Sequence, residues 1–377
     1  MSRTIVDVHV VQTVPPSNIN RDDTGSPKTA VYGGSRRSRV SSQAWKRATR
    51  DAFDDHLDAG ELGVRTKRVV ELLTEQIVKQ DPSLEDTAGA LATEVLTQAG
   101  IKLKDARKKE APAESGYLLF LSRSQIIGLA ELAVAAAREA GDGKPVVDKK
   151  TAKARANQAH SVDVALFGRM VADDTDLNVD AAAQVAHALS VHEVSNEYDY
   201  YTAVDDHKKA DSEEDSGAGM IGTVEFNSST LYRYATVDVN RLNDNLGDAE
   251  ATRRAVEAFT RSFVTSMPTG KQNTFANRTL PDAVLVIVRE SQSMNLVGAF
   301  EEAVGPDDKG GRIGATMTRI ADYAHELHQA YDETPVAAWS VGIGDRTDVL
   351  SGIGQRTSFD TLASALGELV AQRLEQR

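Results

Sequence analysis

The chain has 377 residues, a formal net charge of −13, an apolar fraction of 41% and no cysteine. This composition excludes wholesale disorder, and the length allows one large domain or two to three modules. The lack of cysteine excludes a disulfide framework, cysteine-ligated zinc, iron–sulfur clusters and a thiol nucleophile. We find neither an apolar run long enough to span a membrane nor a signal-like segment, so we expect a cytoplasmic protein with no membrane partner.

Positive charge is concentrated near the start of the chain. Residues 21–50, here called the basic block, hold eight Lys and Arg residues and only two acids, a charge of +6. The rest of the chain therefore carries −19. A basic block on an acidic body is typical of a polyanion site, although a solvated basic loop has the same composition.

The first elements in chain order are a strand, a loop and a helix. Residues 4–14 are rich in Val and Ile and are predicted to form a strand. Residues 15–37 contain Pro, Gly, Asn and Asp and are predicted to form a long loop. Residues 41–57 are predicted to form a helix with Ser41 or Ser42 as the N-cap.

The predicted helix at 41–57 has two different faces. At 100° per residue, one face carries Trp45, Ala48, Ala52 and Phe53. The opposite face carries Gln43, Lys46, Arg47 and Arg50. We therefore expect a packed side and a cationic side, and the positive N-terminal end of the helix could hold phosphates together with the adjacent cations.

The remaining pattern indicates an α+β fold. Helices are predicted for 64–100, 122–141, 249–267, 315–331 and 358–376, and for the first part of 151–170, ending near Gly168. Strands are predicted for 223–239, 282–291 and 337–343. Residues 141–150 are predicted to form a linker, and 205–222 a polar, acidic loop or hairpin arm. Residues 184–194 fit either a helix or a strand.

The sequence contains little that matches known catalytic motifs. His325 and His328 are three residues apart, whereas the zinc-protease motif needs two His residues four apart. His187 and His192 lie in an apolar segment and are interpreted as core or subunit-contact residues. We therefore expect no bound metal, no cofactor and no catalytic residue.

Several segments together resemble the backbone subunit of the type I-E CRISPR Cascade complex. The first and most specific is NINRDDTGSPKTAVYGGSRRSRVSSQAWKRATR at 18–50. VDVALFGRM at 162–170, AHALSVHEV at 186–194, VEFNSSTLYRYA at 224–235 and PTGKQNTFA at 268–276 follow in the same order as in that family. The resemblance covers most of the chain and is weakest at 56–160 and after about residue 295.

The resemblance implies a right-hand shape for the fold. A modified RRM-like, ferredoxin-like palm would comprise residues 1–57, 161–202 and 223–377. Helical fingers would comprise 58–160, and a protruding thumb loop 203–222. Subunits of this family bind CRISPR RNA, polymerise along it with other Cascade subunits, and present it for pairing with target DNA without cutting.

The resemblance also assigns residues to RNA binding. Phosphate contacts are implied for Lys28, Arg36, Arg37, Arg39, Lys46, Arg47 and Arg50. Ser41 and Gln43 would add neutral hydrogen bonds to the RNA backbone, and Met170 and Thr202 would flank a displaced nucleotide. Lys271 and Gln272 would contact RNA or a neighbouring subunit, and Lys149, Lys150 and Lys153 would approach target DNA. Without the resemblance, Met170 fits a core methionine better.

Two other functions stay open at this point. Relatives in type III CRISPR complexes cleave target RNA with an acidic residue on a loop, a role that Asp22 or Asp23 could fill. The same two carboxylates fit better as salt-bridge partners that order the loop among its arginines. A purely structural protein that assembles without RNA is the third possibility.

Overall fold

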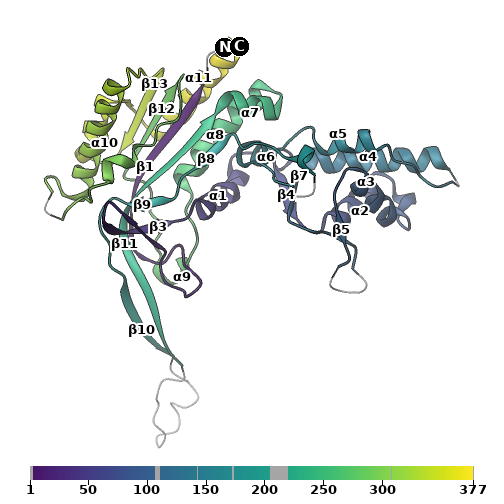
Figure 1. The fold of residues 1–377 in the computed structure, drawn as a ribbon, viewed down its shortest axis with the longest axis horizontal. Coiled ribbons are helices and arrows are strands. Elements are labelled where there is room, and N and C mark those ends of the chain that lie inside the picture. Colours follow the sequence, from purple (N-terminus) through teal and green to yellow (C-terminus); the bar gives the residue numbers. More distant parts are fainter. Residues whose placement is uncertain are drawn as a thin grey trace, which may run out of the picture.

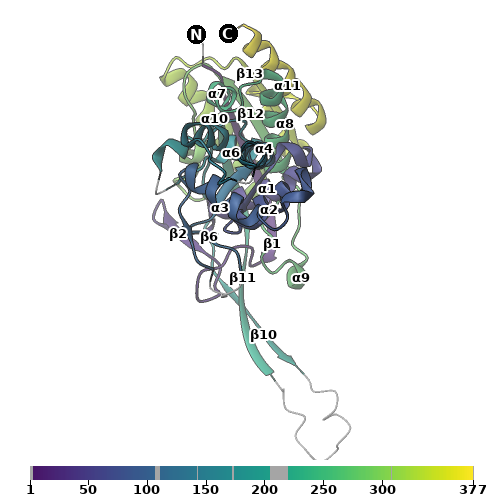
Figure 2. The ribbon, with the colours of Figure 1, turned by 90° about the vertical axis from the view of Figure 1, so that its right-hand side faces the viewer.

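The computed structural model describes residues 3–106, 111–141, 143–171, 174–203, 220–306 and 308–376. A large sheet with helices on both faces forms the body of the molecule (Figure 1). A group of helices extends from one side of this body, and a two-stranded arm projects from the end of the sheet opposite the two termini (Figures 1 and 2). The α+β prediction is therefore confirmed.

The sheet is built around the long central strand β1 (Ile5–Ser17), which pairs antiparallel with β11 (Met220–Asp238) and with β12 (Ala283–Arg289). The strand order is β14-β13-β12-β1-β11-β9-β3-β2, and β8 and β10 also pair with β11. All of these pairs are antiparallel except β13–β14. The other strands are β2 (Thr29–Tyr32), β3 (Ser35–Val40), β8 (Ala183–Val185), β9 (Ala188–Ser190), β10 (Glu197–Ala203), β13 (Ala337–Gly342) and β14 (Gln355–Arg356).

Helices cover both faces of the sheet because β1 sends apolar side chains to each side in turn. Val6, Val8 and Val10 point into a core shared with α8 (Ala249–Thr265) and α11 (Phe359–Glu375). Val11 points into a second core under α10 (Gly311–Ala330) and the 3-10 helices η6 (Leu296–Phe300) and η7 (Asp345–Gly352). Helix α1 (Ser42–Asp51) lies beside α8 on the first face.

A second group of helices has its own core. We call residues 63–156 the helical unit and the rest the sheet unit. The helical unit contains α2 (Val69–Gln80), α3 (Ala88–Gln98), α4 (Arg123–Ala140) and α5 (Lys149–Ala156). Its strands are β4 (Gly63–Thr66), β5 (Leu103–Lys104), β6 (Glu114–Ser115) and β7 (Leu119–Ser122). Its core also takes in Val171 and Leu177 from the following segment.

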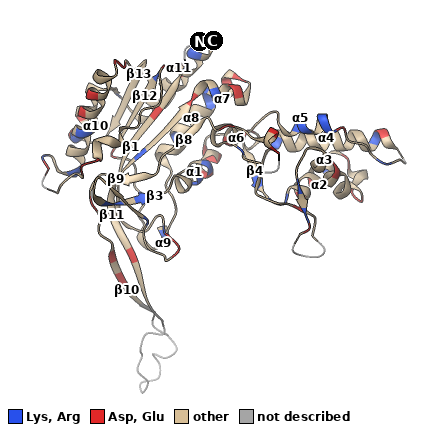
Figure 3. Cartoon of the chain, viewed as in Figure 1, with Lys and Arg blue, Asp and Glu red and all other residues tan. Residues whose placement is uncertain are grey.

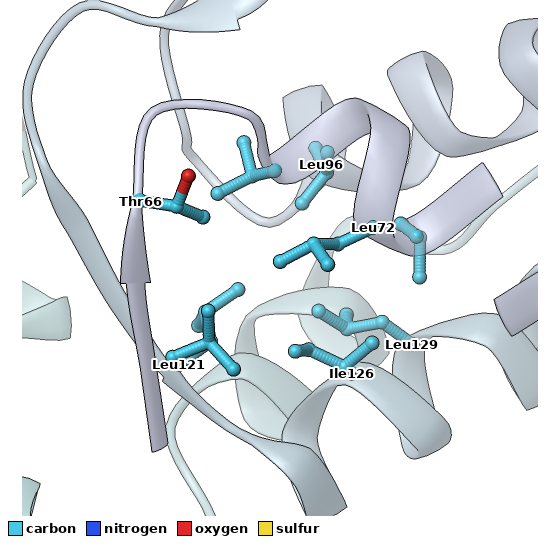
Figure 4. Close-up of a pocket in the computed structure, with 9 residues that line it drawn as sticks. Thr66, Leu72, Leu96, Leu121, Ile126 and Leu129 are labelled. Atoms are coloured by element: carbon cyan, nitrogen blue, oxygen red, sulfur yellow. The ribbon is translucent and has the colours of Figure 1, made fainter. Parts of the chain in front are cut away.

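An apolar gap of about 10 Å³ remains inside the helical unit, between β4, β7 and helices α2 to α4 (Figure 4). Thr66, Leu72, Leu96, Leu121, Ile126 and Leu129 are among the side chains that line it. A space of this size holds at most one water molecule, and the lining gives a water almost no hydrogen-bond partner. This gap is a packing imperfection and not a ligand site.

Several predicted boundaries are wrong. Residues 64–100 do not form one helix, because β4 comes first and the 3-10 helix η3 (Pro82–Leu84) separates α2 from α3. Proline has no backbone N–H and its ring clashes with the preceding turn, so a helix does not continue through it. The predicted helix at 41–57 ends at Asp51 and continues as the 3-10 helix η1 (Ala52–Asp55). The predicted linker at 141–150 already contains the start of α5.

The predicted loop at 15–37 is also partly wrong, since it contains β2 and β3. Gly33 and Gly34 turn this hairpin with φ of +56° and +75°, a conformation that favours glycine. The ambiguous segment 184–194 forms the short strands β8 and β9. Residues 204–219 of the predicted thumb lie outside the described residues. Within the part of the chain that the structure describes, no helix has the length and apolarity needed to cross a membrane.

Candidate nucleic-acid interface

The loop that opens the basic block is fastened to the start of α1. The Asn20 side chain accepts a hydrogen bond from the Ser41 N–H at 2.8 Å, and the Asn20 carbonyl accepts one from the Lys28 N–H at 2.9 Å. The Arg39 N–H in turn donates to the Lys28 carbonyl at 2.9 Å. The Asn18 amide group donates to the carbonyls of Gly25 and Glu225. Lys28 and Arg39 are therefore held beside the N-terminal end of α1.

Helix α1 has the two faces that its sequence predicts. Trp45 and Thr49 are buried, and the Arg233 guanidinium lies 3.7 Å from the centre of the Trp45 ring. Gln43 and Arg47 are exposed, and Ser41 is the N-cap, whose hydroxyl accepts from the Ala44 N–H. The buried face fixes the helix on the sheet unit, which leaves the cationic face directed outward.

Two cations of α1 lie against aromatic rings where the sheet unit meets the helical unit. Lys46 Nζ is 5.9 Å from the centre of the Phe167 ring, and the Arg50 guanidinium is 5.7 Å from the centre of the Phe120 ring. Partial burial lowers the pKa of Lys46. Such contacts hold long side chains in place while their charged ends remain available. Arg47 and Arg50 pair only loosely with Asp51, at 3.6 and 3.8 Å.

Met170 is exposed, not buried in a core. It follows α6 (Val162–Phe167), and 83% of its surface is accessible. The interpretation of Met170 as a core methionine is therefore wrong. Thr202 lies on β10, opposite Ile221 of β11, and its side chain is outside what the structure describes.

Arg37 does not fit the predicted phosphate contact. It is fully buried, and its guanidinium donates to the carbonyls of Ser190, Phe300 and Glu301 at 3.0, 2.9 and 3.2 Å and to the Ser35 hydroxyl at 3.0 Å. A side chain with its donors engaged in this way cannot also face RNA. Arg37 instead ties the β2–β3 hairpin to β9 and to the end of η6. Its neighbour Arg36 is exposed, as the alternation of a strand requires.

His187 is a member of this surface that sequence reasoning missed. Its Nδ1 lies 3.2 Å from Arg39 Nη1, and it is exposed. Partial burial, with the charges of Arg39 and Lys28, lowers the pKa of His187 below its usual value. The imidazole is therefore neutral at pH 7 beside two cations. The interpretation of His187 as a core residue is therefore wrong. Its place in the interface could not be predicted, because it lies between β8 and β9, far along the chain from the basic block.

Lys271 and Gln272 come much later in the sequence but lie beside the loop that opens the basic block. They lie at the start of the one-turn helix α9 (Gln272–Phe275), where Gln272 is exposed and Lys271 is half-exposed. A Cβ at Gly270 would lie 2.3 Å from the Ile19 carbonyl, so this turn packs directly on the opening loop. The rings of Phe275 and Phe226 are 5.7 Å apart, which fastens α9 to the base of β11.

The two-stranded arm, formed by β10 and residues 220–226 of β11, has a different character. Its described part carries acids, shown red in Figure 3, and exposed tyrosines. Tyr198 and Tyr200 share one face and are 67% and 64% accessible. The described arm therefore offers aromatic surface instead of cations. Lys149, Lys150 and Lys153 are on α5, at the upper edge of the helical unit in Figure 1, whereas the arm projects downward; Lys153 is paired with Asp174 at 2.7 Å.

Asp22 closes its own turn. Its carboxylate accepts from the Thr24 hydroxyl at 2.7 Å and from the Thr24 and Ser26 N–H groups at 2.9 and 3.0 Å. The Thr24 hydroxyl makes the largest contribution to lowering the pKa of Asp22. The expected ion pairs between this carboxylate and nearby arginines are not formed in the described residues. In the same part of the chain, no three His, Asp or Glu side chains gather in a way that could hold a metal ion.

Comparisons with known proteins place this chain in a family. A family model described as "CT1975-like protein" matches residues 6–365, so the chain belongs to the CT1975-like protein family. Its fold is similar to a chain of a solved "CRISPR RNA-guided surveillance complex, pre-nicking", with 36% identity and a TM-score of 0.84. That match covers 97% of this chain and 100% of the other.

A second similar structure is a chain of a "CRISPR RNA-guided surveillance complex" with 32% identity and a TM-score of 0.74. This match covers 97% of the present chain and 99% of the other. The comparison with curated proteins gave no match. The similarity to subunits of CRISPR surveillance complexes therefore extends over nearly the whole chain.

Proposed function

We propose that this protein is the CRISPR RNA-binding backbone subunit of a type I-E Cascade surveillance complex. The observation that carries the proposal is the basic block, in which hydrogen bonds hold Lys28 and Arg39 beside the N-terminal end of α1 and its cations. The likeness to surveillance-complex chains over nearly the full length supports the same conclusion. An anionic polymer is the ligand that such a row of cations binds.

The sheet unit serves as an RRM-like palm in this proposal. Its central strands lie in the order β12-β1-β11-β9, with α1 following β1 and α8 following β11, which supports a ferredoxin-like βαββαβ core. The helical unit corresponds to the fingers at 58–160. The arm of β10 and β11 carries the thumb at 203–222.

RNA is held through its backbone in this proposal. The exposed or half-exposed cations Lys28, Arg36, Arg39, Lys46, Arg47 and Arg50 contact phosphates, with Lys271 at the base of the arm. Ser41 and Gln43 add neutral hydrogen bonds at the start of α1. Phosphate contacts position an RNA without reading its sequence, which suits a protein that must accept any guide. Met170, exposed and apolar, and Thr202 flank a displaced nucleotide.

The subunit polymerises along the guide with further copies and other Cascade subunits, and the guide pairs with target DNA. We propose that the subunit itself is not catalytic and acts in the cytoplasm. The alternative, an RNA-cleaving subunit of type III character, would use Asp22 or Asp23. The hydrogen bonds that Asp22 makes within its own turn favour a structural role for that carboxylate.

A titration of labelled single-stranded RNA at several salt concentrations tests the proposal. Neutralising about six phosphates gives a log–log slope of about −4, at roughly −0.7 for each phosphate on a single strand. Lys46→Ala should weaken the binding of unrelated RNA sequences by the same factor, whereas a loss confined to one sequence would contradict backbone recognition. Metal-dependent RNA cleavage that disappears in Asp23→Asn would establish the enzymatic alternative.

A further inference from the structure

The junction between the sheet unit and the helical unit contains little apolar contact of its own. The chain passes from one core to the other within a few residues, since Leu166 packs in the sheet core and Val171 in the helical core. Between the two cores, the described residues form only a small cluster of Phe120, Val164 and Val179. So small a cluster cannot by itself fix the angle between two units of this size.

A buried arginine lies at this junction, two residues after the end of α6. Arg169 is 5% accessible, and its Nε donates to the Leu177 carbonyl at 2.8 Å. Its Nη2 donates to the Ala156 carbonyl at 3.2 Å and to the Asn157 side chain at 3.0 Å. Its Nη1 donates to the Phe120 carbonyl at 3.3 Å. One guanidinium therefore ties the chain just after α6, whose Leu166 packs in the sheet core, to the end of α5, to strand β7 and to the segment after Met170.

The backbone around Arg169 is equally constrained. Arg169 and Val179 exchange both of their backbone hydrogen bonds, at 3.0 and 2.8 Å. Gly168 has φ of +78°, and a Cβ there would lie 2.8 Å from the Val179 carbonyl, so this position requires glycine. Burial lowers the pKa of Arg169 to about 10, and the side chain stays charged at neutral pH.

The groups predicted to hold RNA lie directly around this arginine. Met170 is the next residue, and Lys46 lies over Phe167, two residues before Arg169. Arg50 lies over Phe120, whose carbonyl Arg169 binds. A change in the angle between the two units would therefore move the Phe120 ring, which belongs to the helical unit, away from Arg50 and relative to Met170.

We propose that Arg169 is a positioning residue that locks the helical unit against the sheet unit, and thereby holds Met170, Lys46 and Arg50 in one arrangement for RNA. Arg169 itself does not contact RNA in this proposal. The inference rests on the proposed RNA-binding function. It adds that polar contacts set the angle between the units, with Arg169 making the largest number of them. The Gly63 N–H, which donates to the Asp163 carboxylate at 3.0 Å, and the Ser122 hydroxyl, which donates to the Ala159 carbonyl at 2.7 Å, add to these contacts.

The chain offers a direct measurement because it has no cysteine. Glu131→Cys on α4 and Asp322→Cys on α10 replace exposed residues of the two units, and spin labels there report the distance between them. We expect one narrow distance distribution in the otherwise unchanged protein and a distribution at least twice as broad in Arg169→Gln. Arg169→Lys keeps the charge but has fewer hydrogen-bond donors, so its distance distribution should have an intermediate width.

Arg37→Gln is the matched control, because Arg37 is also buried and also binds backbone carbonyls, but entirely within the sheet unit. It should lower the melting temperature without broadening the distribution. An Arg169→Gln protein that melts earlier but keeps the narrow distribution would show a merely structural role and overturn the inference. Arg169→Lys keeps the test decisive if Arg169→Gln fails to fold.

RNA binding by the same proteins separates this inference from the proposed function. Arg169→Gln should bind single-stranded RNA at least about fivefold more weakly than the unchanged protein. Across the variants, the loss of RNA affinity should increase with the width of the distance distribution. Unchanged affinity in a variant with a broadened distribution would overturn the positioning role. Absence of RNA binding by the unchanged protein would refute the proposed function itself, and with it the positioning of an RNA site.

Discussion

Arg36 and Arg37 are adjacent in sequence, but one is exposed and the other is buried. Substituting each in turn therefore separates effects on RNA binding from effects on stability. Arg36 is exposed on β3, whereas Arg37 is buried under β9 and the end of η6. We expect Arg36→Gln to weaken RNA binding without changing stability. We expect Arg37→Gln to lower stability without changing the salt dependence of RNA binding.

The size of each effect follows from the contacts. Arg37→Gln leaves the carbonyls of Ser190, Phe300 and Glu301 without their donor, and one glutamine amide can replace only part of it. A buried polar group left unsatisfied costs about 1–3 kcal/mol, so a loss of about 3 kcal/mol is expected. For a protein of this length, that loss lowers the melting temperature by roughly 4 °C.

Arg36→Gln should change the free energy of unfolding by less than about 0.5 kcal/mol, because no buried group depends on it. It should make the log–log salt slope of RNA binding shallower by about 0.7, the share of one phosphate on a single strand.

Thermal unfolding and RNA titration over a series of KCl concentrations measure both quantities for the two variants and the unchanged protein. The interpretation of Arg37 is refuted if Arg37→Gln melts at the normal temperature and makes the slope shallower by the same amount as Arg36→Gln. In that case Arg37 would leave its carbonyl partners and contact RNA.

Three further predictions concern other parts of the interface. Met170→Ala should leave the melting temperature unchanged, because the side chain is exposed. It should abolish the fluorescence increase of a base analogue placed at the displaced position of bound RNA. A retained increase would contradict the flanking role. RNA affinity should rise as the pH falls from about 7 to 5. Bound phosphate offsets the charges of Lys28 and Arg39, which lets the pKa of His187 rise. RNA binding is therefore expected to take up a proton at His187. His187→Gln should remove this proton uptake, and an unchanged pH dependence in that variant would exclude His187 as its source. Labelled RNA incubated with the protein and Mg²⁺ should stay intact, and Asp23→Asn should not alter the result; cleavage lost in that variant would contradict a non-catalytic role.

The parts of the interface that depend on local pattern could be predicted from the sequence. The charge of the basic block and the 100° spacing on α1 are local properties, and both the buried Trp45 and the outward cations follow from them. The displaced-nucleotide role of Met170 rests on the family resemblance alone, because by its sequence a lone methionine fits a core position better. The structure removes that core alternative by showing Met170 exposed.

Contacts between distant segments could not be predicted in this way. Nothing local distinguishes Arg37 from Arg36, since the carbonyls that bind Arg37 belong to residues more than 150 positions away. His187 meets Arg39 only because β9 pairs with β3. The role of Arg169 depends likewise on the fold of the helical unit, which gives the guanidinium its acceptors.

The backbone role makes a claim about assembly that one experiment tests directly. The mass of the complexes that the purified protein forms on single-stranded RNA can be measured for a series of RNA lengths by native mass spectrometry or light scattering. If the subunit polymerises along a guide, the mass of the complex should rise in steps of one protein chain as the RNA lengthens. A single fixed stoichiometry at every length, or no complex at low salt, would contradict the account.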